Sequence, residues 1–399
     1  MKSLLRMKHS ALLALMFLPL FVITSCTDSD EPADIPVHTS QTVIMYFPWS
    51  GNDIYRYFLE NIKDFETAIV NNHGMSNNSL IVFIAEDGNT SHLIHITYEN
   101  NECRRDTLKE YDFNSCNYTT AAGITSIIND AAAACPNKTY ALTIGCHGMG
   151  WIPVNRSTTF SLKAAAGSSL NYYPTRYFGH SSDNKYQTDI TTLAAGIAAT
   201  GIKMQYILFD DCYMSNVETA YELRNVTDYL IASTCEIMID GMPYDVIGID
   251  LLNNNYKGVA DGFYDFYSTS TRPYGTIAVT DCREIGVMAD IMLQINTAYP
   301  DGVSSTTDIQ DLDGYSPTIF FDFGDYVAKL CTDQSLLTLF NEQLERLVPY
   351  KAYTPEYYCG STGNTKDIET FSGLTISDPT SDSSVAGEIY STAWYKATH

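Results

Sequence analysis

Two stretches of the chain, residues 139–150 (TYALTIGCHGMG) and residues 204–218 (MQYILFDDCYMSNVE), decide the predicted fold. Each opens with an apolar run of strand length and then turns polar. The first run leads into His147, and the second leads into Cys212 with a helical segment behind it. Because the carboxyl ends of parallel strands meet at one edge of an open sheet, both side chains are expected where such sheets bind substrates.

The segments around these two strands alternate between strand and helix patterns. Further buried strands are predicted by four continuous apolar runs, at residues 42–47, 79–85, 229–233 and 276–279. Residues 92–98 alternate like one arm of a hairpin. Helical spacing is found at residues 53–71, 119–134, 188–199, 216–224, 244–252, 259–267, 282–296 and 322–347, the last with a break near residue 332. We therefore expect an α/β fold with a mostly parallel central sheet and helices on both faces.

The first 25 residues have the features of an export signal. Lys2, Arg6 and Lys8 form a basic region, and an apolar run over residues 11–23 follows it. This run is too short to span a bilayer and is typical of a signal peptide. The small residue just before Cys26 resembles the bacterial lipobox, in which the cysteine is lipidated and becomes the mature N-terminus. The alternative is an ordinary secretory signal with a coincidental cysteine.

The residues after Cys26 are acidic and predict a disordered tether over residues 26–40. An acidic stretch at this place resembles the surface-export signals of Bacteroidetes lipoproteins. We therefore expect a cell-envelope protein that its lipid anchors to a bacterial outer membrane, with exposure at the cell surface.

The charge and the cysteine count exclude several classes of protein. A formal net charge of −24 repels phosphate backbones, so nucleic acid is not an expected partner. If Cys26 carries lipid, nine cysteines remain, and this odd number leaves at least one thiol unpaired. No two cysteines have the CxxC spacing of zinc ribbons or thioredoxin-like redox sites.

A cysteine and a histidine at neighbouring strand ends suit nucleophilic catalysis. The thiolate is the attacking species, and a nearby imidazole takes the proton and later returns it to the leaving amine. The amino end of the helix after Cys212 favours negative charge there. The backbone N–H groups of Gly148 and Cys212 are candidates for an oxyanion hole. The alternatives are a cysteine that acts as a small buried hydrophobe and, for Cys146 with His147, half of a metal site that has no second ligand pair.

Several segments together resemble the clostripain family of cysteine peptidases, of the caspase, gingipain and legumain clan. They are residues 147–151 (HGMGW), 210–218 (DDCYMSNVE), 233–236 (STCE) and 241–244 (GMPY). The resemblance covers residues 42–296. It implies a caspase-like fold and an endopeptidase that forms a thioester acyl-enzyme, with Cys212 as nucleophile, His147 as general base and Gly148 at the oxyanion.

The resemblance also implies cleavage after Arg or Lys, with an acidic residue in the specificity pocket. The candidates are Asp210, Glu236 and Asp240, although Glu236 stands where the family has an aspartate. An equally weighted alternative for Asp210 is a structural role, as a buried carboxylate that accepts hydrogen bonds from backbone N–H groups. Glu236 has the alternative of a solvent-facing or ion-paired residue. Glu218, six residues after the nucleophile, is predicted to be structural.

Family members are often activated by self-cleavage between the histidine and the cysteine, and a long irregular segment at residues 153–185 fits that position. Lys163 is the leading candidate for the cleavage site, with Arg156 and Arg176 behind it. The alternative is a plain lid or specificity loop.

The expected layout is a signal peptide (1–25), the tether (26–40), a caspase-like peptidase domain (41–300) and a C-terminal extension of the same domain (301–399). No cofactor or metal is expected. Calcium is implied by the family resemblance alone, because Asp308, Asp311 and Asp313 lack the full ligand spacing and predict a solvated turn. The expected partners are a peptide or protein substrate and the membrane. The rival hypothesis is a catalytically inactive surface lipoprotein that acts as a binding scaffold.

Overall fold

The computed structural model describes residues 40–48, 54–87, 89–154, 186–360, 362–383 and 385–399. The chain divides into two units, residues 1–34 and 35–399, and the second is the unit described below. Several predictions concern residues outside the described ranges. They are the signal peptide, Cys26, most of the tether and the self-cleavage segment with Lys163. In the described part of the chain, no helix has the length and apolar character needed to cross a membrane.

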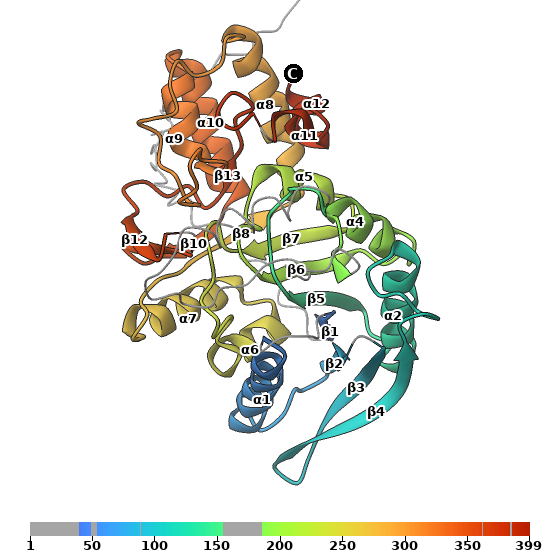
Figure 1. The fold of residues 1–399 in the computed structure, drawn as a ribbon. Helices are drawn as coiled ribbons and strands as arrows, with labels where there is room; N and C mark the ends of the chain where they lie inside the picture. The colour runs from blue at the N-terminus through green and yellow to red at the C-terminus, as the bar shows by residue number, and fades with distance from the viewer. Residues whose placement is uncertain (1–39, 49–53, 88, 155–185, 361, 384) are drawn as a thin grey trace, which may run out of the picture. The chain divides into compact units, whose positions relative to one another are not determined.

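A nine-stranded sheet forms the centre of the unit, in the order β10-β8-β7-β6-β5-β1-β2-β3-β4 (Figure 1). The middle strands β1, β2, β5, β6 and β7 run parallel, and antiparallel pairs flank them on both sides, which confirms the predicted mostly parallel sheet. The strands span β1 (Gln41–Phe47), β2 (Ser79–Ala85), β3 (Thr90–Glu99), β4 (Glu102–Asp112), β5 (Thr139–Gly145), β6 (Met204–Asp210), β7 (Thr227–Ala232), β8 (Thr276–Asp281) and β10 (Tyr350–Tyr353).

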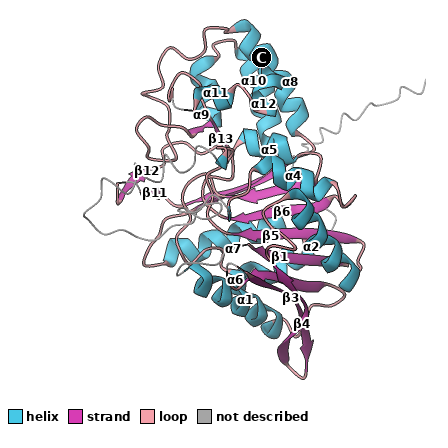
Figure 2. Ribbon diagram, turned by 45° about the vertical axis from the view of Figure 1, so that its right-hand side comes forward, coloured by secondary structure: helices cyan, strands magenta, loops and turns pink. Residues whose placement is uncertain are grey.

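Helices cover both faces of this sheet, which is why its middle strands are continuous apolar runs (Figure 2). On one face pack α1 (Ile54–Asn71), α6 (Tyr244–Asn253) and α7 (Tyr256–Thr269). The other face carries α2 (Ala121–Ala134), α4 (Ile190–Ala198), α5 (Val217–Leu223) and α8 (Ile285–Ala298). Each helix lies close to its predicted range, because its apolar residues recur at helical spacing.

The sequence did not predict the outer strands β4 and β10. Strand β4 reads ECRRDTLKEYD, and nearly all of its residues are exposed or half-buried. It pairs with β3 at the edge of the sheet, where most of its side chains reach solvent, so they carry no apolar period. Strand β8 was predicted, but its antiparallel pairing with β7 was not.

The last hundred residues pack against the rest of this unit. They contain β9 (Phe321–Asp322), α9 (Phe323–Leu330), α10 (Gln334–Leu347), β11 (Glu356–Cys359), β12 (Asn364–Asp367), β13 (Thr375–Ile376), α11 (Ala386–Ile389) and α12 (Ala393–Thr398). Helices α9 and α10 are separated at the predicted break. The segment around β13 reaches the loop after β6, where the Thr375 N–H donates to the Ser215 carbonyl at 3.0 Å. The C-terminal segment therefore lies beside the residues that follow Cys212.

Candidate functional site

The predicted nucleophile and base lie at the ends of adjacent parallel strands. Strands β5 and β6 pair in register, with Gly145 opposite Asp210. His147 and Cys212 each follow their strand end by two residues. The sheet therefore brings both residues to the same rim, as the sequence predicted, since neighbouring strands are only about 4.8 Å apart.

The two loops beyond the strands touch through their backbones. A Cβ atom added to Gly148 would lie 2.2 Å from the Cys212 carbonyl oxygen and 2.8 Å from the Cys212 nitrogen. No side chain larger than hydrogen fits in this contact. Glycine after the histidine is thus required for the close approach of the two loops.

Asp211 links the same two loops, a role that the sequence analysis did not predict. Its Oδ1 accepts a hydrogen bond from the Cys146 N–H at 2.7 Å, and its Oδ2 accepts one from the Cys146 thiol at 3.4 Å. The carboxylate is fully buried. Charge-assisted hydrogen bonds in such a dry place are strong, so Asp211 fixes the backbone that carries His147. The only signal in the sequence was the repeated aspartate before the nucleophile.

The sulfur of Cys212 is covered in this structure. Cys212 is 1% exposed and His147 is 8% exposed. Cys212 packs in a small apolar cluster with Met149, Tyr213 and Phe320. The Ile237 N–H, which follows β7, donates to the Cys212 sulfur at 3.4 Å.

The amino end of the helix after Cys212 was predicted to lie beside the cysteine, but the helix begins too late in the chain for this. Helix α5 starts at Val217, so its first turn does not include the cysteine. Asn216 caps it by accepting from the Thr219 N–H at 2.7 Å. Tyr213 has a left-handed backbone with φ of 62° and stacks on Phe320. The donor that reaches the sulfur is therefore a loop N–H and not a helix terminus.

Two of the predicted specificity residues are buried and bind backbone N–H groups. Asp210 accepts from the Met242 N–H at 2.9 Å. Glu236 accepts from the Tyr213 hydroxyl at 2.8 Å and from the Gly360 N–H at 2.8 Å. Glu236 thus ties the loop after Cys212 to the C-terminal segment.

The third candidate, Asp240, lines an acidic hollow of about 130 Å³. Glu60, Asp64 and Asp245 line it as well. Burial, followed by the charges of Asp245 and Glu60, raises the pKa of Asp64. Asp240 forms an ion pair with Arg272, the one cation that approaches it among the described residues. Met242, whose N–H binds Asp210, also lines this hollow and so links it to the end of β6.

The predicted solvated turn around Asp313 is wrong. Asp313 is fully buried, and its carboxylate accepts from the N–H groups of Tyr315, Ile319 and Phe320 at 2.8, 2.6 and 2.8 Å. Burial outweighs these hydrogen bonds and raises its pKa to about 7. Asp313 therefore organises the loop that carries Phe320, a member of the cluster in which Cys212 is buried.

The structure gives no metal site or disulfide in the ranges that it describes. No three His, Cys, Asp or Glu side chains there are grouped as metal ligands. All nine cysteines after Cys26 are described, and none of them forms a disulfide. Burial raises the pKa of the Cys235 thiol to about 11, which makes it a poor nucleophile.

Comparisons with known proteins agree with this geometry. The model of the clostripain family of peptidases matches residues 47–315. A secreted C11 cysteine protease of Bacteroides thetaiotaomicron, called iotapain, is 49% identical, with a TM-score of 0.81 over 91% of this chain and 100% of that one. A search of curated proteins found no significant match.

Two further solved structures are similar. A clostripain of B. thetaiotaomicron ATCC 29148, in complex with the peptide inhibitor BTN-VLTK-AOMK, is 56% identical, with a TM-score of 0.53 over 56% of this chain and 99% of that one. An inactive zymogen of a C11 protease from Parabacteroides distasonis is 25% identical, with a TM-score of 0.74 over 92% of this chain and 99% of that one.

Replacing Asp211 tests its role as the link between the loops. Asp211→Ala leaves the buried Cys146 N–H without an acceptor, so we expect it to lower the free energy of unfolding by about 2–4 kcal/mol. Asp211→Asn keeps one acceptor oxygen and should cost about half as much. Urea unfolding measures both values. Equal stability of wild type and Asp211→Ala would show that the link is dispensable.

Replacing Gly148 tests the contact between the loops. In Gly148→Ala the new methyl group meets the Cys212 backbone, so the loops must separate, and we expect a loss of about 2–3 kcal/mol. Gly286→Ala in α8 is the matched control, because a Cβ there meets nothing within 4 Å. Thermal unfolding should show a clear drop for the first variant and none for the second. A similar drop in both would contradict the close contact.

Proposed function

Because the chain belongs to the clostripain family and is a cysteine protease, we propose that it is an endopeptidase that uses Cys212 and His147 as a catalytic pair. The observation that supports this pairing is the register of β5 and β6, which puts both residues just beyond adjacent strand ends. The peptide inhibitor bound to one relative supports a peptide substrate.

The proposed reaction proceeds in two steps. The His147 imidazole takes the thiol proton, and the Cys212 sulfur attacks the scissile carbonyl carbon. The backbone N–H groups of Gly148 and Cys212 donate to the oxyanion of the tetrahedral intermediate. The intermediate then expels the amine, which receives the proton from His147, and leaves a thioester. Water hydrolyses this thioester, so no cofactor enters the reaction.

We propose that the covered arrangement of Cys212 is that of a precursor. A substrate carbonyl cannot reach a sulfur that is 1% exposed without movement of the residues above it. Among these residues, Phe320 belongs to the C-terminal segment. A relative of known structure is an inactive zymogen. Cleavage after Lys163, or after another basic residue of the segment 155–185, is the proposed activating step.

A basic residue before the scissile bond is the proposed specificity, and Asp240 is its proposed acceptor. Asp240 lines a hollow with three other carboxylates and already holds a guanidinium, that of Arg272. Glu236 is less suited, because Tyr213 and Gly360 occupy its Oε1 in the interior. Asp210 supports the hollow through Met242. The inhibitor bound to one relative carries the peptide sequence VLTK, which ends in lysine.

We further propose that Cys26 carries lipid and anchors the protein to the bacterial outer membrane, with the protease at the cell surface. The signal-like leader and the small residue before Cys26 support this proposal. A relative is described as secreted, which agrees with export.

Replacing the nucleophile tests the catalytic pair. Cys212→Ala should lower kcat/KM for a fluorogenic lysyl peptide by at least about a thousandfold, because no thioester can form. Cys103→Ser, which changes a half-buried thiol on β4, is the control and should keep full activity. Retained hydrolysis in Cys212→Ala would exclude the proposed mechanism. A wild type that neither hydrolyses peptides nor labels with iodoacetamide at Cys212 would favour the scaffold hypothesis.

Replacing Asp240 tests the specificity. Asp240→Asn should lower kcat/KM for lysyl substrates about 10–100-fold and change little for substrates with a neutral residue there. Glu236→Gln separates the two acidic candidates and should leave the ratio of lysyl to neutral cleavage unchanged. Arg272→Ala removes the internal cation and should lower KM for lysyl substrates. If Glu236→Gln and not Asp240→Asn changes the ratio, the assignment of Asp240 is wrong.

A further inference from the structure

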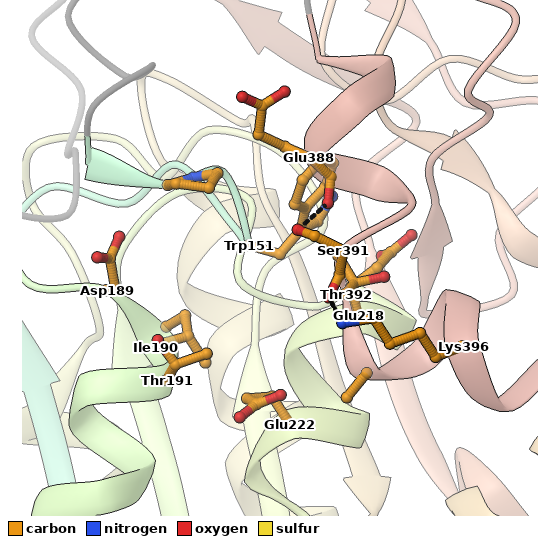
Figure 3. A pocket seen from close by; sticks show the side chains of 12 residues that line it. Trp151, Asp189, Ile190, Thr191, Glu218, Glu222, Glu388, Ser391, Thr392 and Lys396 are labelled. Carbon is orange, nitrogen blue, oxygen red and sulfur yellow. Dashed lines mark hydrogen bonds between the residues drawn. The ribbon is translucent and has the colours of Figure 1, made fainter.

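A second and larger hollow lies on the side of α5 that faces the C-terminal helices. Its volume is about 460 Å³, within the range of small-ligand sites. Trp151 and Pro153 line it from the segment after His147, and Ile190 lines it from α4 (Figure 3). Its lining contains none of the proposed catalytic or specificity residues.

The polar lining of this hollow is mainly acidic. Asp189, Glu218, Glu222 and Glu388 line it, against one basic residue, Lys396. The ammonium of Lys396 donates to the Ser391 carbonyl at 2.6 Å and forms no ion pair with a carboxylate among the described residues. The lining therefore holds four carboxyl groups and a single cation.

Glu218 is the buried member of this set. It is 3% exposed, and its Oε1 accepts from the Ser377 N–H at 3.0 Å. Its Oε2 has no hydrogen-bond partner among the described residues and is shielded from solvent. A buried carboxyl oxygen without a partner costs free energy, which a ligand that donates a hydrogen bond to it would recover.

Trp151 gives the hollow a rigid apolar wall. Its indole N–H donates to the Ser377 hydroxyl at 2.9 Å, and the Ser377 N–H donates to Glu218. The ring and the carboxyl are therefore held by the same residue, Ser377. An aromatic ring beside a carboxyl group suits a cation on an apolar stem.

We propose that this hollow is a binding site for a primary ammonium group on an apolar stem, such as a free diamine or the lysine side chain of a peptide. The ammonium would donate to the Glu218 Oε2, and the stem would lie along Trp151 and Ile190. A divalent metal ion fits less well, because no three ligating side chains are grouped there among the described residues.

Binding in this hollow should be linked to a proton. Burial raises the pKa of Glu218 to about 8, so the free carboxyl is largely protonated at neutral pH. The arriving ammonium favours the ionised carboxylate, and one proton leaves to solvent for each cation bound. The other titratable or charged groups around the carboxyl are Asp189, Glu222, Glu388, Lys396 and, from α9, Tyr326. The affinity should therefore rise by roughly tenfold per pH unit below the Glu218 pKa.

Calorimetric titration of the full chain with cadaverine tests the proposal. We expect one site whose affinity rises roughly fiftyfold from pH 6 to pH 8, with release of nearly one proton at pH 6 and about half a proton at pH 8. A parallel titration uses acetyl-Gly-Lys-Gly-amide, with its norleucine analogue as the neutral control. Tighter binding of the lysyl peptide identifies a peptide side chain as the ligand, and tighter binding of cadaverine identifies a free amine.

Variants separate this site from the acidic hollow at Asp240. Glu218→Gln should weaken cadaverine at least about tenfold at pH 8 and remove the pH dependence. Glu222→Gln, at a less buried position, should weaken it about threefold. Glu60→Gln removes a carboxylate from the other hollow and should leave the affinity unchanged. The proposal is overturned if wild type does not bind at millimolar cadaverine, or if Glu218→Gln and Glu222→Gln both bind like wild type.

The proposal does not depend on peptidase activity, because its readout is binding. The same titration of Cys212→Ala should give the wild-type affinity. If the protein bound cadaverine through Glu218 but hydrolysed no peptide, the proposed function would be wrong and the proposed binding site would stand.

Discussion

The contact between the loops after β5 and β6 is the constraint on which the site depends. Gly148 lies against the Cys212 backbone without room for a methyl group, and Asp211 bonds the Cys146 backbone from the opposite loop. Adjacent parallel strands bring the two loops within reach, but the glycine and the buried carboxylate set their separation. His147 and Cys212 belong to different loops, so they keep a fixed relative geometry only if such contacts hold.

The C-terminal segment completes the site from the other side. Ser215 forms three hydrogen bonds with this segment. Its carbonyl accepts from the N–H and the hydroxyl of Thr375, and its hydroxyl donates to the Gly373 carbonyl at 2.7 Å. Asp313 accepts hydrogen bonds from the loop that carries Phe320, which stacks on Tyr213 and belongs to the same buried cluster as Cys212. The C-terminal segment therefore stabilises the loop after β6 and also contributes to the cluster in which Cys212 is buried.

The sequence was sufficient for the fold and for the place of His147 and Cys212, because buried parallel strands are continuous apolar runs and their order fixes which loops meet. It was not sufficient for β4, whose exposed edge position removes the apolar period. The structural roles of Asp211 and Glu236 could also not be predicted from the sequence. Their hydrogen-bond partners Cys146 and Gly360 lie far away in the chain, and no local pattern encodes such a pairing.

Buried carboxylates recur around this site, and they act on the backbone. Asp210, Asp211, Glu236 and Asp313 all accept hydrogen bonds from loop N–H groups. Loops have no regular ladder to satisfy their N–H groups, and a carboxylate accepts several of them at once. The raised pKa of Asp313 shows that burial exceeds the gain from three such bonds, so its charge is costly in this place. The buried acidic residues beside Cys212 are thus explained by loop geometry, whereas Asp240 lines a hollow and pairs with Arg272.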